Sequence, residues 1–154
     1  MSGNLFTIKQ KDDQVVLTML REAEDLADLQ PFFIAFDNLF SDENMEKVGG
    51  KLYVFCDCSK IEINPMFIRL NVVKSICEFL MKRKEVLQMK IAVCSILISS
   101  KILSLTVSAL LSKLSIVDET EKNKVMALEV SHDKDICKDF LKTERAKRTY
   151  LTRN

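Results

Sequence analysis

Apolar positions along the 154-residue chain follow two spacings, one typical of buried strands and one typical of amphipathic helices. Runs rich in consecutive or β-branched apolar residues predict strands at residues 5–8, 15–20, 52–56, 91–98 and 125–130. Apolar residues at steps of three and four predict helices over residues 31–41, 65–80, 103–114 and 132–141. The predicted class is therefore α/β, with about four amphipathic helices and the order ββαβαβαβα.

This order predicts a mixed, mainly parallel sheet with an N-terminal β-hairpin, because strands that alternate with helices are joined by right-handed crossovers. A polar stretch at residues 9–14 separates the two strands of the hairpin. We expect residues 1–141 to form a single domain, as the chain length favours. Residues 142–154 lose the apolar periodicity and carry several basic side chains, which predicts a fraying, basic C-terminal tail.

The most apolar stretch, residues 91–111, is about as long as a bilayer crossing requires. Lys101 stands at its centre and serines interrupt it, and both are costly in a membrane. The apolar spacing also changes within the stretch, from that of a strand to that of a helix. We therefore expect a strand followed by a helix, and no membrane span.

The net charge and the glycine content exclude further classes of function. The net charge is +1, from 23 basic and 22 acidic residues, which gives no global attraction to nucleic acid. The basic residues after position 141 are interpreted as a solvated tail, because aromatic residues are not interleaved with them beyond Tyr150. Only three glycines occur, and Gly49-Gly50 precedes a predicted strand, whereas phosphate-binding loops place glycines after one. We expect no cofactor.

Five cysteines, an odd number, lie in apolar segments, and residues 1–10 lack a basic start followed by an apolar run. This pattern predicts free thiols in a reducing, cytoplasmic setting. Cys56 and Cys58 have the wrong spacing for a zinc site, and the single histidine, His132, is far from them in sequence. Nothing in the sequence brings a cysteine to that imidazole. We expect no metal site and no catalytic residue.

Two features leave alternatives open. Asp57 ends the predicted central strand, where α/β sheets bind ligands but where an aspartate also commonly caps a loop. Four phenylalanines of the first predicted helix could form a core or a pocket for a hydrophobic ligand; they are Phe32, Phe33, Phe36 and Phe40. Phe32 and Phe33 are adjacent, so we expect one of them at the surface.

The hairpin, the strand LYVFCD at residues 52–57 and the following CSKIEINP at residues 58–65 resemble the STAS-like family of anti-sigma-factor antagonists and sulfate-transporter modules. The resemblance implies a contact surface on the loop after the central strand and on the start of the next helix. Its partner-binding residues would be Asp57, Ser59, Asn64, Pro65 and Met66. Family antagonists carry a phosphorylatable Ser or Thr at that helix start, whereas residues 63–67 here have no hydroxyl group.

We therefore expect a non-catalytic regulatory module of STAS-like fold that binds another protein, without the serine switch. The alternative is a domain that binds a small hydrophobic ligand or lipid between its first helix and the sheet. An enzyme that uses Asp57 or a cysteine is the least supported class. A homodimer is compatible with the sequence.

Overall fold

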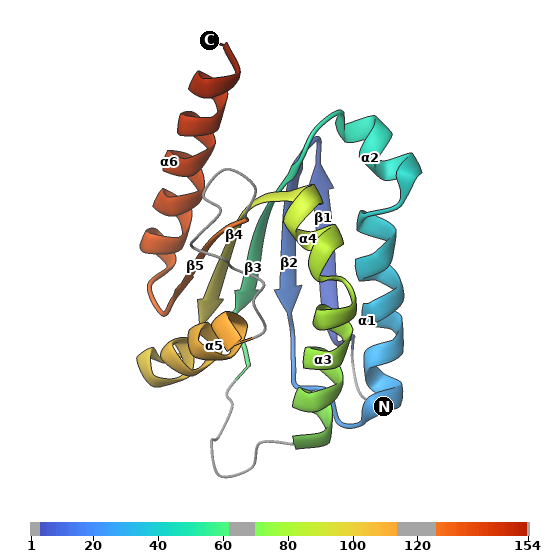
Figure 1. Ribbon diagram of the computed structural model, residues 1–154. Coiled ribbons are helices and arrows are strands. Elements are labelled where there is room, and N and C mark those ends of the chain that lie inside the picture. Colours follow the sequence, from blue (N-terminus) through green and yellow to red (C-terminus); the bar gives the residue numbers. More distant parts are fainter. Residues whose placement is uncertain (1–3, 62–69, 114–125, 154) are drawn as a thin grey trace.

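Five apolar runs pair into one sheet in the computed structural model, which describes residues 4–61, 70–113 and 126–153 (Figure 1). The strands are β1 (Phe6–Lys11), β2 (Gln14–Met19), β3 (Leu52–Cys58), β4 (Ile91–Ile98) and β5 (Ala127–Ser131). Their order in the sheet is that of the chain, with β1 antiparallel to β2 and each later pair parallel. The predicted mixed sheet with its N-terminal hairpin is confirmed.

The helices divide between the two faces of this sheet. They are α1 (Leu26–Leu39), α2 (Asp42–Val48), α3 (Leu70–Lys82), α4 (Lys84–Lys90), α5 (Lys101–Lys113) and α6 (Lys134–Arg153). Successive side chains of a strand point to opposite faces, so two neighbouring residues of β3 show which helices pack on each face of the sheet. Val54 packs in the large core that includes residues of α1, α4 and α5, whereas Phe55 packs with Cys137 of α6. Helix α6 therefore covers the opposite face, over β3, β4 and β5.

The first helix begins earlier than predicted, at Leu26 rather than at Pro31. Asp25 caps it, because its side chain accepts a 2.9 Å hydrogen bond from the Asp28 backbone N–H. Arg21 in turn donates to both carboxylate oxygens of Asp28, at 2.6 and 2.9 Å. These contacts hold the first turn in place, so Pro31 lies inside the helix and does not start it.

Two short helices were not predicted, so the described residues hold six helices rather than about four. Helix α2 begins after Ser41, whose hydroxyl accepts from the Asn44 N–H, and ends at Gly49 with a φ of +70°. That left-handed conformation favours glycine, and the Gly49 N–H closes the last turn on the Met45 carbonyl. Helix α4 follows α3 after Arg83, where the sequence predicted a single helix end.

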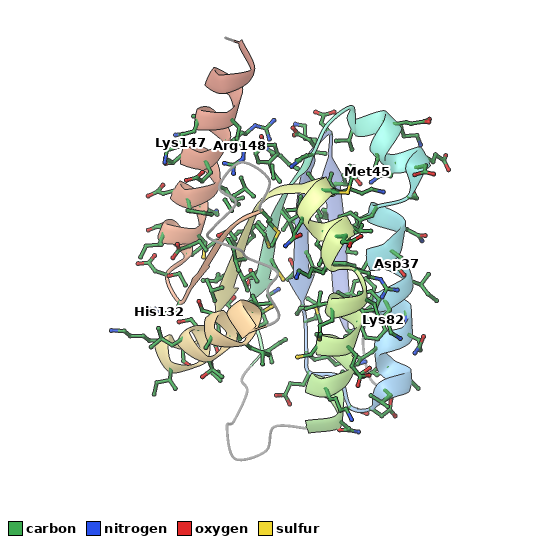
Figure 2. The ribbon with its side chains drawn as sticks, viewed as in Figure 1. Asp37, Met45, Lys82, His132, Lys147 and Arg148 are labelled. Atoms are coloured by element: carbon green, nitrogen blue, oxygen red, sulfur yellow. The ribbon has the colours of Figure 1, made fainter. Side chains whose placement is uncertain are left out.

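Arg83, at the break between α3 and α4, joins this end of α3 to α1. Its guanidinium lies 3.6 Å from the centre of the Phe79 ring and donates to Asp37 of α1, with one contact of 2.8 Å. Figure 2 shows Asp37 on α1 facing the end of α3, beside Lys82. The sequence pattern alone does not reveal this contact, because Asp37 and Arg83 are 46 residues apart.

The C-terminal end of the chain also differs from the prediction. Residues 134–153 form one continuous helix, so the expected fraying tail from residue 142 is wrong for the described residues. Glu144 pairs with Arg148 at 2.7 Å and with Lys147 at 3.3 Å, while Arg145 reaches Asp13 in the hairpin turn. Figure 2 places Lys147 and Arg148 on this stretch of α6. Polar pairs one turn apart, rather than an apolar stripe, support the helix there.

Residues 91–111 divide as predicted into a strand and a helix, with a connection at residues 99–100 between β4 and α5. All but one of the eight residues of β4 are buried, as a central parallel strand requires. Within the described ranges, no helix is both long and apolar enough to cross a bilayer.

Candidate functional site

The predicted contact surface begins at the end of β3, and its first two residues form one turn. The Asp57 carboxylate accepts hydrogen bonds from the Ser59 backbone N–H at 2.9 Å and from the Ser59 hydroxyl at 2.6 Å. Asp57 is half-buried and Ser59 is exposed. Of the two roles left open for Asp57, the structure places it in a loop-capping contact. Asn64, Pro65 and Met66 lie outside the described residues.

The turn is anchored to the neighbouring strand connection. Ile61 donates its backbone N–H to the Cys58 carbonyl at 3.2 Å, and its own carbonyl accepts from the Ser99 hydroxyl at 3.2 Å. Because β3 and β4 are parallel and paired up to Cys58 and Ile98, their carboxyl ends share one edge of the sheet. The described start of the predicted surface is therefore a fixed turn at that edge.

The thiols of Cys56, Cys94 and Cys137 are poorly suited to nucleophilic chemistry. The Cys56 and Cys58 sulfur atoms lie 3.7 Å apart, and this contact together with burial raises the pKa of Cys56 well above its ordinary value. Burial raises the pKa of Cys94 to about 12, and it also raises the pKa of Cys137. A protonated thiol is a weak nucleophile. Among the described residues, no three potential ligands from His, Cys, Asp and Glu gather as a metal site would need.

These pKa shifts give a prediction for thiol labelling. At pH 7.5 the thiolate fraction of Cys94 is lower than that of an ordinary cysteine by about 10³-fold, and burial restricts access further. We expect iodoacetamide to modify Cys94 at least about 10³-fold more slowly in the folded chain than in urea, as read by peptide mass spectrometry. Equal rates in both conditions would show that this thiol is accessible and ionised.

The phenylalanines of α1 fill the space that the ligand hypothesis assigned to a cavity. Phe33 stacks on Phe79 of α3 with ring centres 4.0 Å apart, and Phe32 meets Phe6 of β1 edge-on at 5.4 Å. Both Phe32 and Phe33 are half-buried, so the expectation that one of them is left at the surface is wrong. They turn to different partners, β1 and α3, which the sequence spacing does not reveal. Phe36 joins the same cluster against Phe79.

A groove that the sequence did not predict lies on the other face, between α6 and β2–β3. It has a volume of about 270 Å³. Its lining combines apolar side chains of the strands with basic side chains of the helix: Gln14, Val15, Val16, Tyr53, Phe55, Lys138, Leu141, Lys142 and Arg145. We call it the α6 groove. The spacing of Lys138, Lys142 and Arg145, at steps of four and three, is the one sequence signal that marks a common helix side.

Arg145 closes one end of the α6 groove. It pairs with the Asp13 carboxylate at 2.9 and 3.0 Å, and its guanidinium lies 4.6 Å from the centre of the Tyr53 ring. The contact pairs the Asp13 charge with that of Arg145. His132, by contrast, is exposed at the connection from β5 to α6 and does not line this groove (Figure 2).

Comparison with known proteins identifies the fold. The chain is similar to the crystal structure of an uncharacterised protein of the DUF3478 family, with a SpoIIAA-like fold, from Shewanella loihica PV-4. The TM-score is 0.50 at 11% sequence identity, over 92% of this chain and 98% of the other. No family model and no curated protein matches the sequence. The SpoIIAA-like, that is STAS-like, fold expected from residues 52–65 is thereby confirmed.

Proposed function

We propose that the protein is a non-catalytic interaction module of STAS-like fold, which binds another protein through the turn after β3 and the loop that follows it. The observation that carries this proposal is the Asp57–Ser59 turn, held at the carboxyl edge of a sheet of this fold. A fixed turn loses little conformational entropy on docking, which favours its use as a rigid contact surface.

The hydrogen bond from Ser59 to Asp57 also bears on regulation. A phosphate on the Ser59 hydroxyl would break the 2.6 Å contact and place negative charge against a carboxylate. Ser59 is therefore a poor substitute for the family's phosphorylated residue, and residues 63–67 contain no hydroxyl group. We infer constitutive docking without a serine switch. The raised pKa values of the buried thiols favour a binding role over a thiol enzyme, and a reducing, cytoplasmic setting suits them.

The experiment is affinity capture of partners from the native host, with the full-length chain as bait. Asn64→Glu combined with Met66→Lys should reduce recovery of the specific partner at least about tenfold, because opposite charges are forced into the contact surface. Melting temperature and circular dichroism should stay unchanged. Unchanged recovery by this double variant contradicts the proposed surface.

A matched control uses the exposed side of α1. Gln30→Glu with Ile34→Lys introduces the same two charges, four residues apart, where Ile34 is 62% exposed. This variant should capture the partner as well as the unmodified chain does. An equal loss with both variants would assign the effect to general charge or folding, and not to the loop after β3.

A further inference from the structure

We propose that the α6 groove is a second docking site, which takes an acidic segment of a partner protein with one apolar anchoring side chain. It lies on the face that α6 covers only over β3, β4 and β5, and it is lined by different residues from the turn after β3. Three observations carry the inference: an exposed apolar floor, basic side chains on both sides of it, and a volume suited to one side chain.

The apolar floor of the groove includes Val16 of β2. Val16 is 39% exposed, although its neighbours Val15 and Leu17 are only 1% and 5% exposed on the opposite face. In register, Val16 lies between Lys9 of β1 and Phe55 of β3. Helix α6 buries Phe55 but leaves Val16 partly open to solvent. The apolar surface at Val16 is therefore available for burial by a docked side chain.

Basic side chains flank this floor. On the helix side, Lys138 and Lys142 line the groove and are exposed, and no carboxylate among the described residues forms an ion pair with either. On the strand side, Lys9 and Lys11 of β1 are exposed and alternate onto the same face as Val16. The lining residues of the groove include no carboxylate, and Asp13, next to the lining residue Gln14, is paired with Arg145.

This arrangement produces a local excess of positive charge on a chain whose net charge is only +1. Complementary charge steers association and selects among partners, so lysines around an apolar floor favour acidic residues around an apolar anchor. The volume of about 270 Å³ is just below the range of small-molecule pockets, roughly 300–1,000 Å³, but accommodates a single large side chain.

Single-stranded nucleic acid fits the groove less well. Binding of that class relies on aromatic rings on which bases can stack. Of the two aromatic residues in the groove, Tyr53 already faces the Arg145 guanidinium and Phe55 is 8% exposed. The groove thus offers charge and an aliphatic floor, while its half-buried tyrosine ring is already in contact with Arg145, which favours an acidic peptide.

The test measures fluorescence anisotropy of a fluorescein-labelled 11-residue peptide, five glutamates on each side of one leucine, titrated with the full-length chain in 50 mM salt. We expect saturable binding that weakens at least about tenfold in 500 mM salt and also when glycine replaces the leucine. Lys138→Glu combined with Lys142→Glu should weaken binding at least about tenfold as well. Both lysines are exposed, so the melting temperature should not change.

The matched control is Lys74→Glu with Lys82→Glu on α3, which makes the same charge change at exposed positions on the other side of the sheet. It should leave the affinity within about twofold. No binding by the unmodified chain, equal loss in both double variants, or tighter binding of an oligothymidine of equal charge would overturn the proposal. The Asn64→Glu, Met66→Lys variant should bind the peptide normally, which separates this site from the loop after β3.

Discussion

Replacing Leu29 by alanine should lower the free energy of unfolding by about 3 kcal/mol, within the range of about 2–5 kcal/mol typical of buried leucines. Leu29 is 1% exposed and packs in a cluster with Leu5, Ala23 and Val72. Truncation removes apolar contacts and leaves a cavity, because α1 is fixed at its start by Asp25 and cannot easily move to fill it.

Urea unfolding followed by circular dichroism measures this effect. The same substitution at Leu26, one turn earlier on the same helix, is the matched control, since Leu26 is 45% exposed. It should cost less than about 1 kcal/mol, because little buried surface is lost and alanine is a good helix former. Equal costs at the two positions would contradict the packing of α1 against β1 and α3.

Prediction from the sequence succeeded where a single contiguous run of apolar residues, or one apolar face of a helix, decides the structure. Leu52 to Phe55 are apolar without interruption, and Ile91 to Ile98 are interrupted only by Ser95. Such runs have few outcomes other than a buried strand. The hairpin followed from two apolar runs around a short polar stretch. The mixed, mainly parallel sheet and the α/β class then followed from the alternation of strands with helices, which the structural similarity supports.

Prediction failed where contacts of polar side chains, rather than the spacing of apolar residues, decide the structure. Pro31 suggested a helix start, but a pair between Arg21 and Asp28 fixes the true start five residues earlier. Likewise, the end of α6 looked like a tail because its helix is supported by polar pairs. One of these joins Arg145 to Asp13, 132 residues away, which no local pattern can reveal.

The two candidate sites also differ in how far the local sequence reveals them. The contact surface predicted at residues 57–66 was found from contiguous sequence, by resemblance, and two of its five predicted residues form one turn in the described chain. The α6 groove combines β2, β3 and α6, so it becomes visible only when the register sets Val16 beside Phe55 and α6 lies across the sheet. Its parts, an exposed valine and two lysines, have ordinary explanations when each is taken alone.

A substitution beneath α6 tests whether this helix packs on the sheet as the structure shows. The α6 groove depends on that packing, because α6 forms one of its sides. Cys137 is fully buried, its thiol donates to the Ile96 carbonyl at 3.5 Å, and its backbone carbonyl accepts from the buried Ser95 hydroxyl at 2.9 Å. Cys137→Asp should lower the free energy of unfolding by at least about 3 kcal/mol at pH 7, since burial strongly disfavours a carboxylate.

The pH dependence of this loss identifies its cause. Burial raises the pKa of an aspartate in the folded chain above its unfolded value of about 3.9, so the folded state holds its proton over a pH range in which the unfolded state has released it. Stability then falls as the pH rises from about 4 towards the folded-state pKa, by up to about 1.4 kcal/mol per pH unit. Cys137→Asn, of similar size but without a titrating group, should cost a similar amount near pH 4 and show no added loss by pH 7. Parallel urea midpoints for the two variants from pH 4 to 8 would mean that position 137 reaches water, and hence that α6 does not close the groove.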